Sequence, residues 1–395
     1  MKRKLFILVL AFLLLPSKTL AAQQESKDWY ESMEYLINDQ LNNLDVSSWE
    51  PFLKYIQEDS SGVIGKKTAG ELIRELIAGK FSFTWQDIFH SVLYAFFYEF
   101  QLNLMLMAKI IGIAVLCSIL RSMADSFQNS SVGEVGYFVC YSVVIILIIQ
   151  SMISVLTVGK TSVDRMSGFM QILFPILLGL LTAMGNFASV AVMQPAVGVL
   201  VGTAGSILSH IVFPLISLSA VITIVNHIGS RIQLHSLGKL LNNLCIWVLS
   251  FVFTIFIGVL TIQGAMTASF DGISIRTAKF AMDTFVPIVG KMLSQSLDAV
   301  IGCSLLLKNA VGTAGLIIIG LLSMAPAVKI FTLMFLYKLS GSLLEPITDK
   351  RIADCLNGTG NVLLVLLVTV LGIALMFFLT TALMIAAGNT AVMLR

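Results

Sequence analysis

Residues 361–385 read NVLLVLLVTVLGIALMFFLTTALMI, a run without a single charged side chain. An α-helix rises about 1.5 Å per residue, so this run reaches about 37 Å and exceeds the roughly 30 Å hydrocarbon core of a bilayer. It therefore predicts a membrane-spanning helix. Comparable apolar runs occupy residues 102–120, 135–158, 211–228 and 241–262. The chain should accordingly cross a membrane several times.

The composition of the whole chain supports this interpretation. Hydrophobic residues make up 57% of the chain and charged residues only 12%, against roughly 45–50% and 25% in soluble domains. Inside lipid, every backbone polar group needs a partner within the protein, which leaves helices and closed barrels as the spanning structures. Because the apolar runs have the length of helices, we expect an all-α fold, a polytopic transmembrane helical bundle.

The N-terminus has the order of a secretory signal peptide. Three basic residues precede an apolar stretch at 5–15, and small residues follow at Ala21 and Ala22. This pattern predicts that residues 1–22 are a signal peptide cleaved near Ala22. The alternative is a retained first anchor, and under either interpretation the next segment is exported.

Residues 23–98 have the composition of a small soluble domain. Acidic side chains outnumber basic ones there, and basic residues favour the cytoplasmic side of a membrane, so we expect an extracytoplasmic helical domain. Helices are predicted from about Ser48, from about Lys67 and from the capping-box pattern that opens at Thr84. The domain could cap the bundle or contact a partner protein, and the sequence leaves both open.

An internal repeat organises the rest of the chain. The pentapeptide Val-Gly-Thr-Ala-Gly occurs at residues 201–205 and again at 311–315. Flanking positions match at a common offset of 112 residues, which is the separation of Pro175 and Pro287. Self-similarity at one fixed offset is typical of a duplicated segment. We therefore predict an internal tandem repeat in the membrane bundle.

The repeat suggests how the membrane part is divided. Residues 99–160 should form a transmembrane helix pair, residues 161–276 the first membrane repeat and residues 277–395 the second, each copy with four helical elements. An even number of crossings makes the copies parallel, whereas an odd number inverts them, as in many transporters. The amphipathic residues 279–298 fit either a crossing with a polar face or a surface-lying helix.

The distribution of basic residues suggests an orientation. With the exported domain outside, Arg121 follows the first span on the cytoplasmic side, as the positive-inside rule prefers. Further basic residues expected on that side are Arg231, Lys239, Lys338, Lys350 and Arg351. The rule is obeyed imperfectly, because Lys160, Arg165, Arg276 and Lys279 would lie outside.

Glycines, prolines and lysines in apolar surroundings are the candidates for function. Small residues let helices approach closely, and we favour this packing role for the glycines. Prolines can mark broken helices, and lysines at membrane depth either line a polar path or snorkel to the interface. The candidate helix-packing or pore-lining residues are Gly198, Gly202, Gly205, Gly312, Gly315, Pro175, Pro287, Lys291 and Lys308.

Signals for enzymatic chemistry are weak. The five cysteines are odd in number and mostly lie in apolar runs, and the histidines lack metal-ligand spacing. Residues 62–68 resemble a phosphate loop but lack the four residues required between its glycines. We expect no catalytic residues, no metal, no cofactor and no nucleic-acid partner.

The combined pattern resembles the stage III sporulation protein AE family of endospore-forming bacteria. The resemblance rests on the signal, the acidic domain, the elements around Pro175 and Pro287, both Val-Gly-Thr-Ala-Gly segments and the tail AAGNTAVMLR at 386–395. It implies a multi-pass protein of the mother-cell inner membrane whose N-terminal domain is extracytoplasmic. It further implies a channel or secretion-like complex with other stage III sporulation operon membrane proteins and a forespore membrane partner, assembled with help from an Oxa1-type membrane insertase.

Two functions therefore stay open. The first is a membrane subunit of that complex, needed for forespore development and late forespore gene expression, as the resemblance implies. The alternative is a permease-like transporter or pore for small solutes, which the repeats and the helix breakers Pro175 and Pro287 motivate. An intramembrane enzyme ranks third, because no nucleophile and base are visible together.

Overall fold

The computed structural model describes residue 35 and residues 37–42, 44–59, 67–80, 85–126, 131–226, 235–285, 289–387 and 389. Within its helices, residues 59, 85, 124–126, 131–134, 235, 267–285 and 289–297 are described by their backbone alone. The predicted signal peptide and Pro287 lie outside the described residues.

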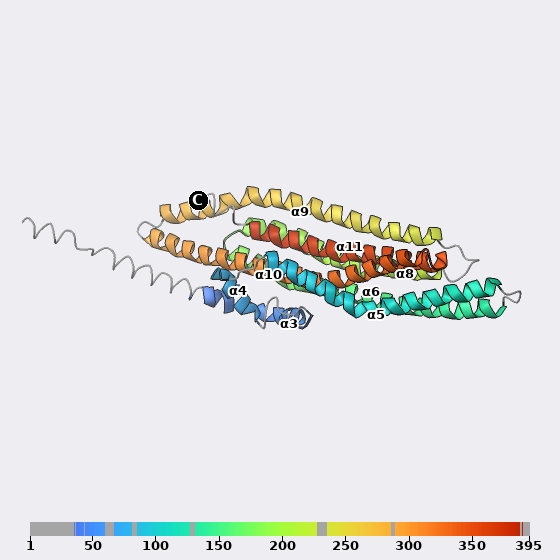
Figure 1. Ribbon diagram of the computed structural model, residues 1–395. Coiled ribbons are helices and arrows are strands. Elements are labelled where there is room, and N and C mark those ends of the chain that lie inside the picture. Colours follow the sequence, from blue (N-terminus) through green and yellow to red (C-terminus); the bar gives the residue numbers. More distant parts are fainter. Residues whose placement is uncertain are drawn as a thin grey trace, which may run out of the picture.

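All regular elements in the described part of the chain are helices (Figure 1). The short N-terminal elements are the 3-10 helix η1 (Val46–Trp49) and the α-helices α3 (Glu50–Asp59) and α4 (Ala69–Ile77). The elements of the bundle are α5 (Trp85–Ser126), α6 (Ser131–Ala183), α7 (Phe187–Ile207), the π-helical segment η2 (Leu208–Val212), α8 (Phe213–Val225), α9 (His235–Phe285), α10 (Val289–Leu344) and α11 (Lys350–Ala386).

Six helices among the described residues are long and apolar enough to cross a membrane. They cover Gln86–Met123, Val135–Ala183, Phe187–Val225, Ser236–Met266, Asp298–Leu344 and Lys350–Ala386. The expected all-α, multi-pass architecture is confirmed. The helices are fewer and longer than expected, because the first predicted repeat holds the end of one spanning helix and two whole ones, and the second repeat holds two. The tandem repeat itself stays a prediction.

The helices are longer than predicted because several prolines lie inside them without ending them. Pro175, Pro195 and Pro326 lie inside α6, α7 and α10, although proline lacks the N–H that bonds the carbonyl four residues earlier. In a membrane bundle, neighbouring helices and local changes of helical pitch compensate for the lost bond. Before Pro214 the change is visible as η2, whose wider π-turns connect α7 to α8 without a break.

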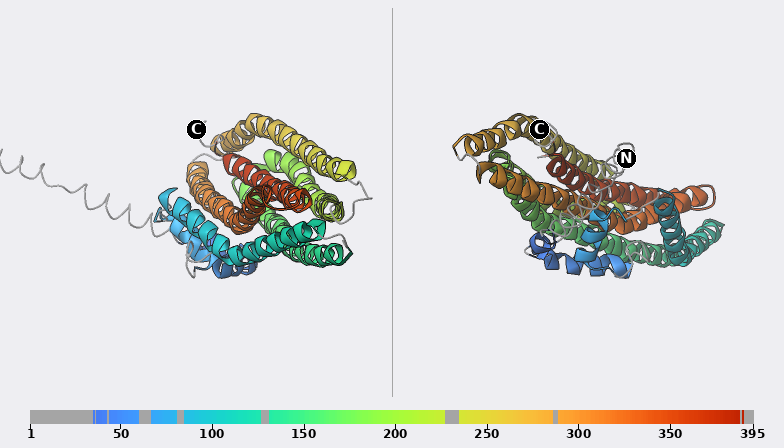
Figure 2. Two further views of the ribbon diagram at one scale, coloured as in Figure 1. Left: turned by 45° about the vertical axis from the view of Figure 1, so that its right-hand side comes forward. Right: turned by 90° about the vertical axis from the view of Figure 1, so that its left-hand side faces the viewer.

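The bundle is longer than a bilayer is thick. Its helices run side by side, with α10 and α11 in the middle, α9 along one edge and the α5–α6 hairpin along the opposite edge (Figures 1 and 2). With 53 and 56 residues, α6 and α10 reach about 80 and 84 Å. Even at a tilt of about 40°, α10 would extend about 64 Å along the membrane normal, so parts of the bundle project beyond the hydrocarbon core.

The N-terminal helices pack against this bundle. α3 and α4 contact α10, and η1 contacts α6. The Trp49 ring is fully buried and meets Phe169 of α6 edge-on, with 5.3 Å between ring centroids. The Arg165 guanidinium lies 3.4 Å from the centroid of the Tyr55 ring, a cation–π contact. The described part of the predicted extracytoplasmic domain is therefore attached to the bundle, as the capping interpretation expected.

A capping box opens α4 close to Lys67, where the sequence predicted the start of a helix, whereas Thr84, at which a capping box was predicted, lies outside the described residues. The Thr68 N–H donates to Glu71 Oε2 at 2.9 Å, and the Glu71 N–H donates to Thr68 Oγ1 at 3.3 Å. The backbone hydrogen bond from Thr68, followed by its side-chain bond, lowers the pKa of the Glu71 carboxyl. The reciprocal bonds satisfy two N–H groups that the first turn leaves unpaired.

Two helical junctions meet at one end of the bundle. Asp349, which precedes α11, forms an ion pair with Arg121 near the end of α5 and accepts a hydrogen bond of 2.9 Å from the Tyr137 hydroxyl of α6. The Ser118 hydroxyl donates to the Ile347 carbonyl at 2.8 Å. The α5–α6 and α10–α11 junctions therefore lie on the same side, which agrees with the predicted grouping of Arg121 with the basic residues that begin α11.

Candidate functional site

The first Val-Gly-Thr-Ala-Gly segment lies in α7 and has one packed face and one open face. Val201, Ala204 and Gly205 are buried, whereas Gly202 and Thr203 are exposed. A Cβ at position 205 would lie 2.6 Å from Ser167 Oγ and 3.2 Å from Ser167 Cβ of α6, so glycine lets the two helices approach without a shift of Ser167. At position 202, nothing described lies within 4 Å of where a Cβ would stand.

The second segment lies in α10, and its two glycines are packed against two different helices. Gly312 is buried against Ile385 of α11. A Cβ at Gly315 would lie 2.5 Å from Leu173 Cδ2 of α6. These glycines let α10 sit between α6 and α11 at close distance, so the geometry favours the packing role for both.

The other candidate residues have different surroundings. Gly198 of α7 leaves ordinary contact distance, 3.5 Å, between a would-be Cβ and the Phe174 ring. Pro175 lies inside α6, next to the buried Phe174. Pro287 is outside the described residues, and of Lys291 only its backbone position in α10 is described.

Lys308 of α10 is fully enclosed and holds the end of α11. Its ammonium donates to the carbonyl oxygens of Ile385, at 2.8 Å, and of Ala387, and to Asn389 Oδ1 at 3.0 Å. The last carbonyls of a helix lack partners within the helix, and the helix dipole favours a cation there. This arrangement favours a structural role for Lys308 over a pore-lining one. Its partners lie almost eighty residues away and could not be predicted from the sequence.

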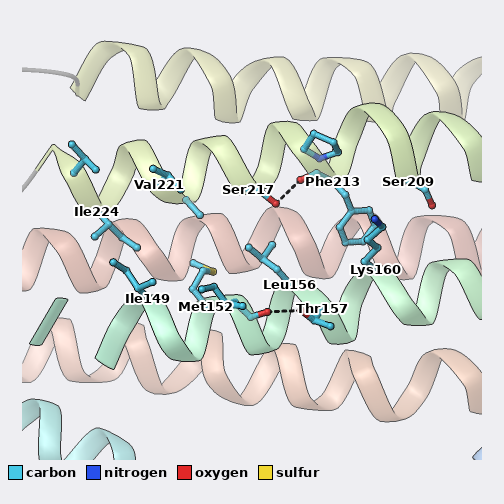
Figure 3. Close-up of a pocket in the computed structure, with 14 residues that line it drawn as sticks. Ile149, Met152, Leu156, Thr157, Lys160, Ser209, Phe213, Ser217, Val221 and Ile224 are labelled. Atoms are coloured by element: carbon cyan, nitrogen blue, oxygen red, sulfur yellow. Dashed lines mark hydrogen bonds between the residues drawn. The ribbon is translucent and has the colours of Figure 1, made fainter. Parts of the chain in front are cut away.

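A groove between α6 and the η2–α8 segment was not anticipated from the sequence (Figure 3). Its volume is about 430 Å³, and most of its lining is aliphatic. The lining residues are Ile149, Met152, Ile153, Leu156, Thr157, Lys160, Ser209, Phe213, Pro214, Ser217, Ala220, Val221, Ile224 and Val225. The three- and four-residue spacing of its α6 positions marks one helix face, but only the fold pairs that face with α8.

Charged and hydroxyl groups gather at one end of this groove. Figure 3 shows Lys160 beside Phe213 and Ser209, while Ile149 and Ile224 lie at the opposite end. The Ser209 hydroxyl donates to Asp164 Oδ1 at 2.6 Å, which ties η2 to α6 one turn beyond Lys160. The groove is thus amphipathic along its length, with an apolar end and a cationic end.

The comparisons with known proteins agree with the resemblance noted in the sequence. Residues 67–388 match the family described as Stage III sporulation protein AE. The chain is also 33% identical over 400 residues to the Stage III sporulation protein AE of Bacillus subtilis (strain 168), with all of both chains covered. The chain belongs to the stage III sporulation protein AE family. No solved structure matches it.

Membership in the stage III sporulation protein AE family places the chain among sporulation proteins, and its six apolar helices make it a multi-pass membrane protein. The family match runs from the capping box of α4 to the end of α11 and so includes Lys308, both glycine segments and the groove. This is a sporulation membrane family and not a known enzyme family. Among the described residues, no three His, Cys, Asp or Glu side chains gather as metal ligands would.

Proposed function

We propose that the chain is an integral membrane subunit of the channel or secretion-like complex that links mother cell and forespore and supports forespore development and late forespore gene expression. The proposal starts from the family, which assigns a stage III sporulation role. It places the protein in the mother-cell inner membrane, with the N-terminal domain facing the space around the forespore.

The rigid attachment of α3 and α4 to the bundle carries this proposal. Trp49 and Phe52 hold the Phe169 ring of α6 between them, with centroid distances of 5.3 and 5.4 Å. On α10, Ser304 accepts a hydrogen bond of 3.1 Å from the Gln40 amide. A small domain fixed in this way cannot reorient freely, so its outer face is presented at a set angle to the membrane. Such preorganisation suits a docking surface.

The outer face of α3 and α4 is charged and exposed. Its exposed ionisable residues are Glu50, Lys54, Glu58, Glu71 and Arg74, which we call the platform. Exposed charges of both signs steer and orient a partner more than they add raw affinity. We assign the platform to contacts with other stage III sporulation operon membrane proteins and with the forespore membrane partner. An Oxa1-type membrane insertase would assist insertion of the bundle.

Affinity purification from sporulating cells tests the proposal. The tagged full-length chain, solubilised in mild detergent, should recover other stage III sporulation proteins. Reversal of both basic platform charges, Lys54→Glu with Arg74→Glu, should lower that recovery several-fold and lower the spore count. Lys350→Glu, an exposed reversal at the far end of the bundle, should leave recovery unchanged. A wild-type chain that purifies alone while it sustains normal sporulation would overturn the proposal.

The alternative, a permease-like transporter or pore for small solutes, has less support from the described residues. Lys308, one of its candidate lining residues, is enclosed and bound to the end of α11. Lys291 keeps the alternative testable. Solute flux in vesicles that contain the chain alone, abolished by Lys291→Ala, would replace the proposed role with a transport function.

A further inference from the structure

The groove between α6 and α8 has a closed floor and open edges. Met152, Phe213 and Ile224 are almost fully buried and form the floor. Ile153 and Val221 form opposite edges and are 59% and 55% exposed. The groove is therefore an indentation in the outer surface of the bundle, open to whatever solvates these helices. In a membrane protein that solvent is lipid.

The groove is about as long as the hydrocarbon part of one bilayer leaflet is thick. From Ile149 to Lys160 the α6 helix rises about 16 Å, and half of the hydrocarbon core of a bilayer is about 15 Å. The apolar stretch that contains Ile149 ends at Val158, and Lys160, Asp164 and Arg165 follow within seven positions. Such a change of composition marks the boundary between hydrocarbon and headgroups. The cationic end of the groove thus lies at headgroup depth.

Of the three charged residues near that end, Lys160 is the one that lines the groove. Asp164 accepts the Ser209 hydroxyl, and Arg165 lies over the Tyr55 ring on the side of the N-terminal helices. Lys160 is exposed and lines the groove itself. A lysine stem along an apolar wall with its ammonium at the interface is the geometry that attracts anionic headgroups.

The hydroxyl groups of the groove already donate to protein atoms. Thr157 donates to the Ile153 carbonyl at 2.8 Å, and Ser217 donates to the Phe213 carbonyl at 2.9 Å (Figure 3). A ligand therefore meets aliphatic walls along the groove and a positive charge at its end. Such a groove would recognise the negative charge of a headgroup and an acyl chain. It would not recognise a particular pattern of hydroxyl groups on the headgroup.

We propose that this groove binds an anionic phospholipid, with one acyl chain between α6 and α8 and the headgroup phosphate beside the Lys160 ammonium. The aliphatic walls along the groove and the single cationic end match the acyl chain and the headgroup of a lipid. In the predicted orientation, the bound lipid belongs to the extracytoplasmic leaflet.

Native mass spectrometry of the full-length protein tests the headgroup contact. The protein is reconstituted in bilayers of equal phosphatidylglycerol and phosphatidylcholine, released into detergent, and the lipids it retains are counted. Wild type should prefer phosphatidylglycerol for its first bound lipid. Lys160→Gln should reduce this preference roughly fivefold, the factor equivalent to the about 1 kcal/mol expected per interfacial lysine, and Lys160→Arg should keep it. Lys109→Gln, an exposed lysine of α5, is the matched control and should change nothing.

A second pair of variants tests the chain-binding part of the groove. Val221→Trp places a large ring at the groove edge and should reduce the retention of both lipids, whereas Val199→Trp, at an equally exposed position of α7, should not. Unchanged headgroup preference in Lys160→Gln, or unchanged lipid retention in Val221→Trp, would overturn the proposal. So would lost recovery of a partner protein in Val221→Trp with lipid retention intact, because a protein would then occupy the groove. Since the lipid measurement needs no other subunit, it is decided separately from the proposed role in the complex.

Discussion

The same five residues, Val-Gly-Thr-Ala-Gly, meet different surroundings in α7 and in α10. In α7, Gly202 and Thr203 face outward. In α10, the matching Gly312 is buried against Ile385 of α11. Three residues before the first residue of the motif, α7 carries Gly198 and α10 carries the enclosed Lys308. An identical motif is thus a full packing site in one helix and a half-open surface in the other.

This contrast teaches that the role of a small-residue motif depends on its neighbours. α10 lies between α6 and α11 and contacts both, so Gly312 and Gly315 each have a helix to approach. α11 is also fastened at both ends, by Lys308 at its C-terminus and by Asp349 with Arg121 and Tyr137 at its N-terminus. The α10–α11 pair should accordingly be the most stable part of the bundle.

The largest effect is expected at the C-terminal fastening of α11. Lys308→Met removes the hydrogen bonds to Ile385, Ala387 and Asn389 and leaves buried carbonyls without their donor, at a cost of about 3 kcal/mol. Thermal unfolding in detergent should show a clear fall in Tm. Lys109→Met, an exposed lysine of α5, serves as the control. Equal Tm values for the two variants would contradict the fastening role.

The next effect compares the two motifs directly. Gly312→Val forces a branched side chain against Ile385 and should destabilise the protein by about 2 kcal/mol. Gly202→Val introduces the same side chain where nothing described lies within 4 Å of the added Cβ, and valine has a slightly higher helix propensity than glycine, so little change in stability is expected. The two Tm values measured side by side give the comparison, and indistinguishable values would mean that the segments are packed alike.

A smaller effect is expected at the N-terminal fastening of α11. Asp349→Asn removes the charge that pairs with Arg121 but keeps an oxygen that can cap the helix, so about 1 kcal/mol should be lost. High salt should reduce the difference between wild type and variant, because salt screens exposed pairs. Asp354→Asn, one turn into α11 and exposed, should show no comparable loss.

The smallest effect has the opposite sign. Gly202→Ala replaces glycine inside a helix at an open position and should raise stability by about 0.5–1 kcal/mol, through the higher helix propensity of alanine. Gly312→Ala should lower stability, since its methyl group would meet Ile385. A fall in Tm for Gly202→Ala would reveal a contact on the outward face of α7 and so remove the contrast between the motifs.

The parts of the fold predicted from the sequence are those that depend on neighbouring residues along the chain. The charge-free run 361–385 specifies a spanning helix by its own length, and it lies within α11 as expected. The helix predicted from about Lys67 is present as α4, although the Thr68–Glu71 capping box that opens it was not predicted. The boundary predicted between the helix pair and the first repeat, at residues 160 and 161, lies inside α6, which continues without a break from Ser131 to Ala183.

The candidate site was less predictable, because its contacts join distant segments. Lys308 is satisfied by residues near position 387, and a sequence scan offers only its unusual presence in an apolar run. Leu156 and Val221 share a groove only because α6 and α8 pack together. The candidate glycines lie in α7 and α10, but which of them are covered depends on the order of helices in the bundle.

Because α6 is one unbroken helix, a tilt at one point displaces its far end. Phe169, where Trp49 and Phe52 press on α6, and Ser131, where the helix begins, are about 57 Å apart along a single helix. A tilt of roughly 5° about the Phe169 contact would therefore move the far end by about 5 Å. A pull on the N-terminal helices would therefore move the far end of α6 by about the length of one helical turn.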